Sequence, residues 1–349
     1  MGLVEGHSAH DTVSALFAAE QAMCDRIVLA QGIVPPATNG VNAFDRSVTV
    51  DAGAGALVLT RAIEHAAEGA RVAVVAPAGS LLASPSAFGV ACARGLPIVA
   101  HAVADAYEAS ALADFGWGVL CSAGARDAID LALIARRAAE DSRTPFMVLH
   151  DRNRLDAGDA PDHEESLAQL VTRFVGPPSF ERGEPSPDRH AFASRVPFAL
   201  GSAFRDWEKQ GRRAIGEITA GSPAPIAIVG PGSLASSLDR EAARLLARGD
   251  AAFALKITAI RPFPGPRIVK MLSRTHVVIV VEWASTPLAQ SPFLAREIKA
   301  AFADALTWAP GYPGIGKIPR IVSLVTESGL VAPDAVDALL ASARRSHTH

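Results

Sequence analysis

The first half of the chain alternates short apolar runs with longer stretches whose apolar positions recur every three or four residues. Apolar runs bounded by Gly, Pro or charged residues are typical of buried strands. We expect these strands at residues 26–30, 71–76, 97–102, 118–122 and 145–150. The longer stretches are rich in Ala, Leu and Arg, which favour helix. We expect these helices at residues 12–23, 53–65, 81–93 and 125–140.

The pattern changes after residue 150. Residues 151–225 are rich in Asp, Glu, Pro and Gly, and the prolines at 177–178 and in the sequence EPSP oppose regular structure. A second series then follows. We expect its strands and helices at residues 225–230 (strand), 238–247 (helix), 320–325 (strand) and 333–344 (helix).

Strands that alternate with helices predict an α/β fold with mostly parallel sheets covered by helices. We therefore expect two such domains, at residues 1–155 and 223–349, joined by an irregular Pro-, Gly- and acid-rich connector at residues 156–222. A chain of 349 residues with 49% hydrophobic residues is long and apolar enough to fill two cores.

Charge and hydropathy exclude several classes of partner. The net charge is −3 and no block of Lys and Arg occurs, so we expect neither nucleic acid nor an anionic membrane as a partner. No apolar stretch reaches the roughly 20 residues that a bilayer span needs, and the N-terminal residues lack a basic region. We expect a cytoplasmic location.

Cysteine and histidine spacing gives no metal site. Cys24, Cys92 and Cys121 are far apart and form no C-x-x-C pair, so we expect buried thiols and no iron–sulfur cluster in this chain. The histidines are scattered without the spacing of metal ligands.

Two apolar runs near residue 270 carry a more specific signal. They are KITAIRPFP at residues 256–264 and HVVIVVE at residues 276–282, and they predict a βαβ unit. Pro262 and Pro264 lack amide donors and must lie outside a strand interior. This segment resembles the strand, "RPFP" turn and strand of the transketolase C-terminal-like domain in 2-oxoacid:ferredoxin oxidoreductases.

Weaker motifs of the same family occur in matching order along the first half. They are EGHSAH (5–10), QGIVPPA (31–37), VDAGAGA (50–56), APAGSLL (76–82) and SRTPFMVLHD (142–151). The chain thus resembles the α-subunit, or first two domains, of such an oxidoreductase. The resemblance implies a thiamine diphosphate-binding, pyrimidine-type domain followed by the transketolase C-terminal-like domain.

The resemblance also implies a shared cofactor site. The chain has no Gly-Asp-Gly with a downstream Asn pair that could hold a diphosphate-bound Mg²⁺. We therefore expect a separate diphosphate-binding β-type subunit to carry the Mg²⁺, and a ferredoxin-like or iron–sulfur subunit to carry the clusters. The expected assembly is a hetero-oligomer with two-fold symmetry, in which this chain contacts the aminopyrimidine of thiamine diphosphate.

Asp51 stands at the position of the family's catalytic glutamate, whose carboxyl group contacts the aminopyrimidine ring nitrogen. Its arm is shorter by one methylene, about 1.5 Å. An aspartate before a Gly-rich helix is also commonly an N-cap, and we weigh both interpretations equally. The resemblance places Val34, Pro35, Gly53 and Gly79 beside the cofactor.

Two substrate anchors of the family are replaced. Its threonine hydroxyl corresponds to Val34 and its active-site arginine to Ala104, so a 2-oxoacid carboxylate loses its usual contacts. His101 and Asp105 flank this position as possible substitutes. A core histidine and a helix cap are the simpler interpretations. For Glu282 and Arg154 we expect surface or interdomain ion pairs.

Three functional hypotheses remain open at this stage. The chain is a catalytic subunit of a thiamine diphosphate-dependent 2-oxoacid oxidoreductase, or a non-catalytic structural or regulatory paralogue. The third hypothesis is a subunit of the dehydrogenase E1β or transketolase type.

Overall fold

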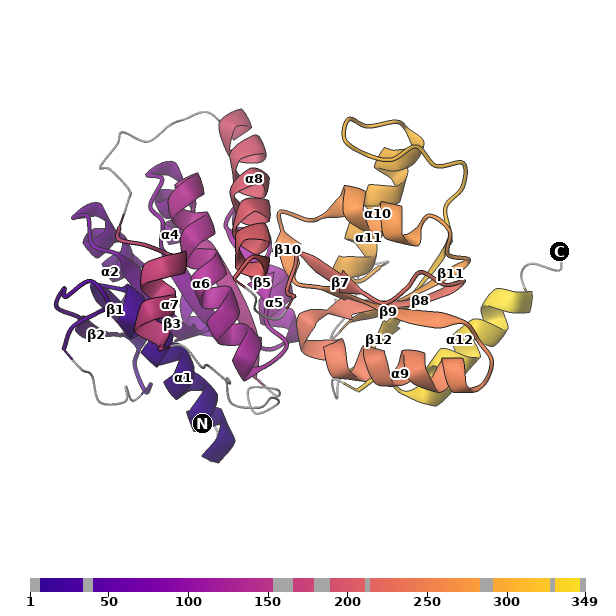
Figure 1. Cartoon of the computed structure of the whole chain (residues 1–349), viewed down its shortest axis with the longest axis horizontal. Coiled ribbons are helices and arrows are strands. Elements are labelled where there is room, and N and C mark those ends of the chain that lie inside the picture. The colour runs from indigo at the N-terminus through magenta and orange to yellow at the C-terminus, as the bar shows by residue number, and fades with distance from the viewer. Residues whose placement is uncertain are drawn as a thin grey trace. The chain divides into compact units, whose positions relative to one another are not determined.

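A computed structural model describes residues 7–33, 40–152, 166–178, 189–210, 214–282, 291–326 and 330–345. The chain splits into two compact units, Met1–Ile215 and Gly216–His349, here called unit 1 and unit 2 (Figure 1). Among the described residues, no helix combines the length and the apolar content that a bilayer crossing requires.

Unit 1 is built on a parallel sheet. Its strands are β1 (Arg26–Ala30), β2 (Thr49–Gly53), β3 (Val72–Pro77), β4 (Val99–Ala104), β5 (Gly118–Cys121) and β6 (Phe146–Asp151). Within this unit they run in the order β5-β6-β4-β3-β1-β2, and every neighbouring pair is parallel. The chain leaves β1 toward one side of the sheet and β3 toward the other, so the strand order reverses between them.

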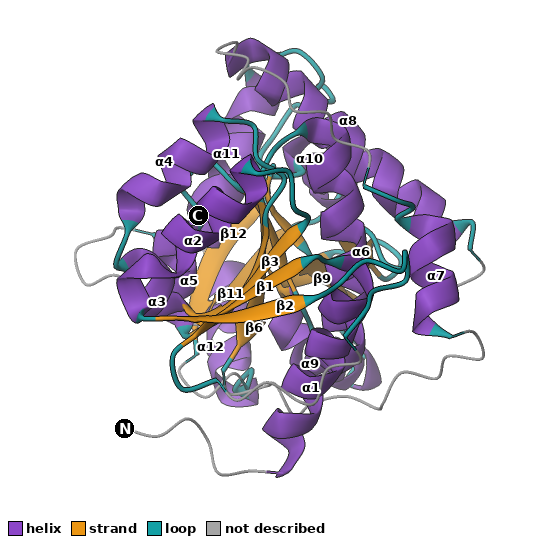
Figure 2. Cartoon of the chain, turned by 90° about the vertical axis from the view of Figure 1, so that its left-hand side faces the viewer, coloured by secondary structure: helices purple, strands orange, loops and turns teal. Residues whose placement is uncertain are grey.

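Helices cover both faces of this sheet (Figure 2). They are α1 (His7–Met23), α2 (Val58–Ala67), α3 (Ala78–Leu82), α4 (Pro85–Ala93), α5 (Ala106–Leu112), α6 (Ala125–Ser142), α7 (Leu167–Phe174) and α8 (Arg189–Glu208), with the short 3₁₀ helix η1 (Gly55–Leu57) before α2. Helix α2 packs on β1 and β3, and α4 packs against α2. Helix α6 packs with α1, α7 and α8. The α/β class expected for this part is confirmed.

The expected connector at residues 156–222 is wrong where α7 and α8 lie. Each helix buries an apolar face, although the many prolines of this segment argue against helix. The buried residues include Leu170 and Phe174 in α7, and Leu200 and Trp207 in α8. The Phe174 and Trp207 rings meet edge to face at 4.9 Å, and α8 packs along α6. Ser166 begins α7 with a capping box. Both helices therefore belong to unit 1, which ends at residue 215.

Strand β2 was not expected. From the sequence we expect VDAGAGA (50–56) at a strand-to-helix junction with a helix over 53–65 and no separate strand there, and Asp, Ala and Gly are poor strand formers. The structure instead pairs β2 in parallel register with β1 at the edge of the sheet, Asp51 opposite Val28. Main-chain hydrogen bonds to β1 therefore outweigh the weak local propensity.

Unit 2 holds a second, mostly parallel sheet. Its elements are β7 (Ile218–Ala220), β8 (Ile226–Pro231), η2 (Gly232–Leu234), α9 (Ala235–Ala247), β9 (Ala252–Ile257), β10 (Ala259–Arg261), α10 (Gly265–Leu272), β11 (Val277–Glu282), α11 (Phe293–Leu306), β12 (Arg320–Val325) and α12 (Pro333–Arg345). The sheet order is β12-β11-β8-β9-β7, with β7 antiparallel to β9. The βαβ unit and the expected strand over 320–325 are confirmed. Ile228, Leu238, Val281 and Val336 are among the side chains that form its core.

Candidate functional site

The carboxyl ends of the unit 1 strands form the expected ligand edge. In open parallel sheets, ligands bind beyond these ends where the strand order reverses. Here the reversal lies between β1 and β3, and the chain continues from β3 into α3 and from β2 into η1 and α2. Val34 and Pro35, which follow β1, lie outside the described residues.

Asp51 lies within the edge strand β2, and its carboxylate is held by a histidine. Oδ2 of Asp51 is 2.8 Å from Nε2 of His65 on α2, with side chains 31% and 25% exposed. The N-cap interpretation of Asp51 is wrong, because the residues at the N-caps of η1 and α2 are Ala54 and Leu57. Sequence reasoning missed His65. The sequence could have indicated His65 only through the expectation that a helix following a strand packs antiparallel to that strand, which brings the end of α2 near β2.

Gly53 and Gly79 both stand where a larger residue would crowd a neighbour. A Cβ on Gly53 would lie 3.2 Å from Val58 Cγ2, and one on Gly79 would lie 3.2 Å from Glu108 Oε1. The small residue at 79 therefore lets the Glu108 carboxylate approach α3. Whether Gly53 or Gly79 contacts a cofactor stays a prediction.

Asp105 caps helix α5, as its simpler interpretation expected. Its Oδ1 accepts the Glu108 amide at 3.0 Å, and Glu108 Oε2 accepts the Asp105 amide at 3.0 Å, which makes a capping box. Ala104 is buried at the end of β4, and its carbonyl accepts the Arg152 amide at 3.1 Å. Arg152 Nη2 lies 3.2 Å from Glu108 Oε2. A guanidinium thus stands near the position where the family's arginine is missing.

His101 belongs to a buried chain of hydrogen bonds on the sheet face covered by α1 and α6. Its Nδ1 is 3.1 Å from His150 Nε2, and its Nε2 is 2.7 Å from Glu20 Oε1. At the other end, His150 Nδ1 is 2.9 Å from Ser122 Oγ. Asp51 and His65 lie on the opposite face, under α2. The structure therefore does not bring His101 together with Asp51, and the core-histidine interpretation is confirmed.

The ionisation of Glu20 fixes the direction of its hydrogen bond with His101. Burial alone would raise the pKa of Glu20, but the Arg136 charge and the His101 hydrogen bond outweigh it and lower the pKa to about 2. An ionised Glu20 accepts, so His101 donates from Nε2. The Ser122 hydroxyl, which lies against His150 Nδ1, also donates to the Leu149 carbonyl at 3.2 Å. Burial, followed by the neighbouring His101, lowers the pKa of His150 well below 6.5, which keeps it neutral.

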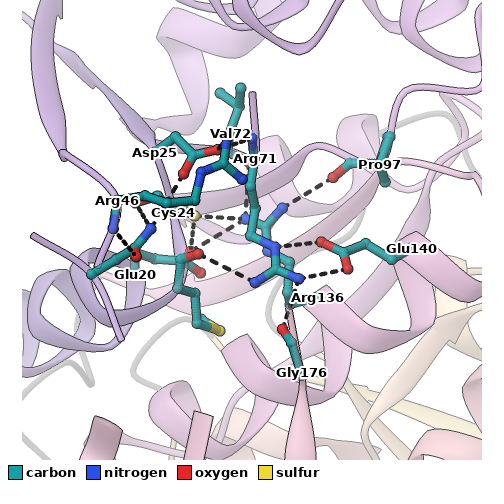
Figure 3. A network of polar contacts seen from close by, with 12 residues as sticks. Glu20, Cys24, Asp25, Arg46, Arg71, Val72, Pro97, Arg136, Glu140 and Gly176 are labelled. Atoms are coloured by element: carbon teal, nitrogen blue, oxygen red, sulfur yellow. Dashed lines mark hydrogen bonds and ion pairs between the residues drawn. The ribbon is translucent and has the colours of Figure 1, made fainter. Parts of the chain in front are cut away.

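Arg136 contacts Glu20, the residue at which this chain of hydrogen bonds ends (Figure 3). Its Nη2 lies 3.3 Å from Glu20 Oε2, 3.2 Å from Cys24 Sγ and 2.9 Å from the Val72 carbonyl, and its Nη1 donates to the Pro97 carbonyl at 3.0 Å. Burial raises the pKa of the Cys24 thiol. The guanidinium and carboxylate are both inaccessible to solvent, so only protein groups can satisfy them, and among the described residues Arg136 Nε has no hydrogen-bond partner.

A second buried ion pair lies nearby (Figure 3). Arg71 pairs bidentately with Glu140, Nε to Oε1 at 2.6 Å and Nη2 to Oε2 at 2.7 Å. Its amide donates to Asp25 Oδ2 at 2.9 Å, and its Nη2 also donates to the Gly176 carbonyl at 3.1 Å. Arg71 precedes β3, Glu140 is on α6 and Gly176 follows α7. This pair therefore ties the sheet to its helical layer.

Glu282 was expected in an ion pair, but it caps a helix in unit 2. Its carboxylate accepts the amides of Leu294 and Ala295, at 2.6 and 3.0 Å, in the first turn of α11. Burial raises the pKa of Glu282 to about 6, against the lowering effect of these two amides. Arg154 lies outside the described residues.

The donor set suits one half of the expected cofactor. Asp51 offers a partly exposed carboxylate whose Oδ2 alone has a described partner, which suits a heterocycle nitrogen. No group of three or more His, Cys, Asp or Glu side chains that could hold a metal ion occurs in the described ranges. The described residues therefore offer the aminopyrimidine one carboxyl oxygen.

Comparison with known proteins gives collinear matches in both units. Residues 46–210 match the family model of the pyruvate flavodoxin/ferredoxin oxidoreductase thiamine diphosphate-binding domain, and residues 224–315 match that of the pyruvate:ferredoxin oxidoreductase core domain II. No curated protein sequence matches the chain.

Two solved structures share the fold. One is a 2-oxoglutarate:ferredoxin oxidoreductase from Magnetococcus marinus with 2-oxoglutarate, coenzyme A and succinyl-CoA bound. It has 14% identity and a TM-score of 0.61, and the match covers 95% of this chain but 64% of that chain. The other is a split-gene transketolase, an inactive β4 tetramer. It has 14% identity and a TM-score of 0.58, and the match covers 98% of this chain and 99% of that chain. The two family models, in this order, identify the chain as a member of the pyruvate flavodoxin/ferredoxin oxidoreductase family with its thiamine diphosphate-binding domain and core domain II.

Proposed function

We propose that this chain is the α-type subunit of a thiamine diphosphate-dependent 2-oxoacid:ferredoxin, or other acceptor, oxidoreductase. Unit 1 supplies the aminopyrimidine side of the cofactor site. The observation that carries the proposal is the thiamine diphosphate-binding family match over residues 46–210, which includes Asp51 on an exposed sheet edge.

Asp51 is the proposed contact to the aminopyrimidine ring. The cofactor, when bound, supplies a carbon nucleophile for addition to a 2-oxoacid carbonyl. Asp51 would hold a carboxyl oxygen at the ring nitrogen, donate its proton to that nitrogen when the carboxyl group is protonated, and accept the proton back from the protonated ring. Gly53, Gly79, Val34 and Pro35 are proposed to line the same cofactor surface.

A separate β-type subunit is proposed to hold the diphosphate and its Mg²⁺. Mg²⁺ needs oxygen ligands in near-octahedral geometry, and the sequence offers no such motif. Electrons from the 2-oxoacid pass to iron–sulfur clusters on a further, ferredoxin-like partner. The proposed assembly is a two-fold symmetric hetero-oligomer.

Affinity purification of the tagged full-length chain from its own cells tests this proposal. We expect a co-purifying diphosphate-binding subunit, bound thiamine diphosphate, iron and acid-labile sulfide, and 2-oxoacid-dependent reduction of an artificial acceptor. An assembly that contains the partner but binds no thiamine diphosphate after reconstitution with Mg²⁺ would refute the proposed function.

A non-catalytic structural or regulatory paralogue is the second candidate. The two residues that could replace the missing substrate contacts favour this candidate, because neither is free to bind substrate. His101 is fully buried in the row of interior hydrogen bonds, and Asp105 caps helix α5. A co-purified assembly that turns over equally well with Asp51→Ala would support it. The transketolase or E1β type is the third candidate, and an active thiamine assembly without iron would support that one.

A further inference from the structure

Helix α2 carries a side chain that holds one oxygen of Asp51. The chain leaves β2 through η1, and α2 then runs back over the sheet with Val58, Leu59, Ala62, Ile63 and Ala66 buried beneath it. His65 lies between these buried positions near the end of α2. Its Nε2 reaches Asp51 Oδ2 at 2.8 Å.

We propose that His65 is a positioning residue for the Asp51 carboxylate, fixing Oδ2 so that Oδ1 remains available to a heterocycle nitrogen. The inference rests on the proposed function of Asp51. A carboxylate can only accept a hydrogen bond, so the geometry assigns the proton to Nε2 of His65. The other ring nitrogen, Nδ1, is 3.9 Å from Oε2 of the exposed Glu68.

If the pair of Asp51 and His65 were purely structural, removing His65 would have only a small effect on stability and on turnover. Edge strand β2 is already bonded to β1 along its length, and Arg61 Nη1 on α2 donates to the Ala52 carbonyl at 2.5 Å. A partly exposed ion pair adds little to such a connection, so removing His65 would lower the melting temperature by no more than about 3 °C. A positioning role predicts a much larger effect on turnover, because a displacement of about 1 Å at a reacting group costs on the order of a hundredfold.

The short arm of Asp51 makes positioning more important here than for a glutamate. The carboxylate reaches about 1.5 Å less far, so fewer of its orientations meet a ring nitrogen. A donor fixed on a rigid helix selects among these orientations without occupying Oδ1.

Three variants of the full chain, purified in its natural assembly, separate the possibilities. His65→Leu removes the donor, His65→Gln keeps an amide donor, and Arg61→Leu removes the other connection between α2 and β2 without touching the carboxylate. We expect His65→Leu to lower kcat about 10- to 100-fold while the thiamine diphosphate affinity changes less than about threefold. We expect His65→Gln to stay within about threefold and Arg61→Leu within about twofold of the parent in kcat.

A measurement without cofactor completes the test. Proton NMR of the full chain should show the Nε2–H of His65 shifted downfield and slowed in its exchange with solvent by the hydrogen bond to the carboxylate, and Asp51→Ala should remove both effects. An unchanged Nε2–H signal in Asp51→Ala, or parental kcat in His65→Leu, overturns the inference. If His65→Leu is fully active while Asp51→Ala is inactive, only the role of His65 fails. An assembly that binds no thiamine diphosphate overturns the proposed function and this inference together.

Discussion

His101 Nδ1 and His150 Nε2 lie 3.1 Å apart in the interior of unit 1, and both side chains are buried. One imidazole must donate and the other must accept, so the pair holds one proton between the two facing nitrogens. Glu20 on α1, Cys24 just after it, Arg136 on α6 and Ser122 after β5 complete the polar surroundings.

Acid is expected to destabilise unit 1 through this pair. The folded pKa of His150 is lowered, so the unfolded chain binds more protons once the pH falls below about 6.5. Stability is therefore complete above this pH and is lost as the pH falls below it, by up to about 1.4 kcal/mol per pH unit and per proton. Denaturant unfolding at several pH values measures the slope.

A matched pair of variants tests whether His150 causes that pH dependence of stability. His150→Gln should flatten it, whereas His276→Gln, at an exposed position of unit 2, should leave it unchanged. A slope that persists in His150→Gln would place the acid sensitivity elsewhere.

Replacement of Glu20 by Gln should be among the most damaging single changes in the interior. It leaves the buried Arg136 guanidinium without its carboxylate and removes an ionised acceptor from His101. Breaking a buried pair from one side costs about 3–5 kcal/mol. The free energy of unfolding measures this loss. The double change Glu20→Leu with Arg136→Met should recover part of it, and no recovery would mean that the pair is not the cause.

Glu282 should give unit 2 a pH dependence of the opposite sign. Its folded pKa, about 6, lies above the ordinary value of 4.5, so the folded state binds the extra proton between these values. The corresponding contribution is present below about pH 4.5 and is lost as the pH rises through 6, on the order of 2 kcal/mol in total. Glu282→Gln should abolish this dependence in pH-resolved unfolding. The control Glu297→Gln, on helix α11 that Glu282 caps, should retain it.

The proposed function predicts that Arg152 binds the substrate carboxylate, because it lies beside Ala104, where the resembled family has an arginine. Its amide donates to the Ala104 carbonyl, its Nη2 contacts Glu108, and its side chain is 38% exposed. Arg152→Ala should raise KM for the 2-oxoacid about tenfold or more with less effect on kcat. Steady-state kinetics measures this. Arg152→Lys should recover little if bidentate binding matters, and an unchanged KM would exclude the contact.

Sequence patterns were most informative where local and tertiary preferences agree. The Val- and Ile-rich strands β1 and β12 have the expected bounds, because their side chains suit a covered parallel sheet. Strand β2 could not be read from Asp51, Ala52 and Gly53, since its pairing with β1 depends on a distant segment. Prolines obscured α7 and α8, whose apolar faces are visible only when the helical period is imposed first.

The residues of the candidate site could be named from the sequence, but their contacts could not. Resemblance selected Asp51 and placed it at a strand-to-helix junction, and the D-x-x-E spacing of Asp105 and Glu108 is a readable capping signal. The bond from His65 to Asp51 joins a strand to the returning helix, and the chain from Ser122 to Glu20 joins segments about a hundred residues apart in sequence. Such contacts arise only when the chain is folded, because sequence spacing carries no information on them.

One experiment on the proposed function combines cofactor content with one substitution. Thiamine diphosphate is quantified in the assembly that co-purifies with the full-length chain, and 2-oxoacid turnover is compared between the parent and Asp51→Ala. We expect about one cofactor per copy of this chain, and a loss of turnover on the order of a hundredfold with cofactor retained and the fold intact. Equal turnover in the parent and Asp51→Ala, or an assembly with its partner but without cofactor, would refute the proposed role of this chain.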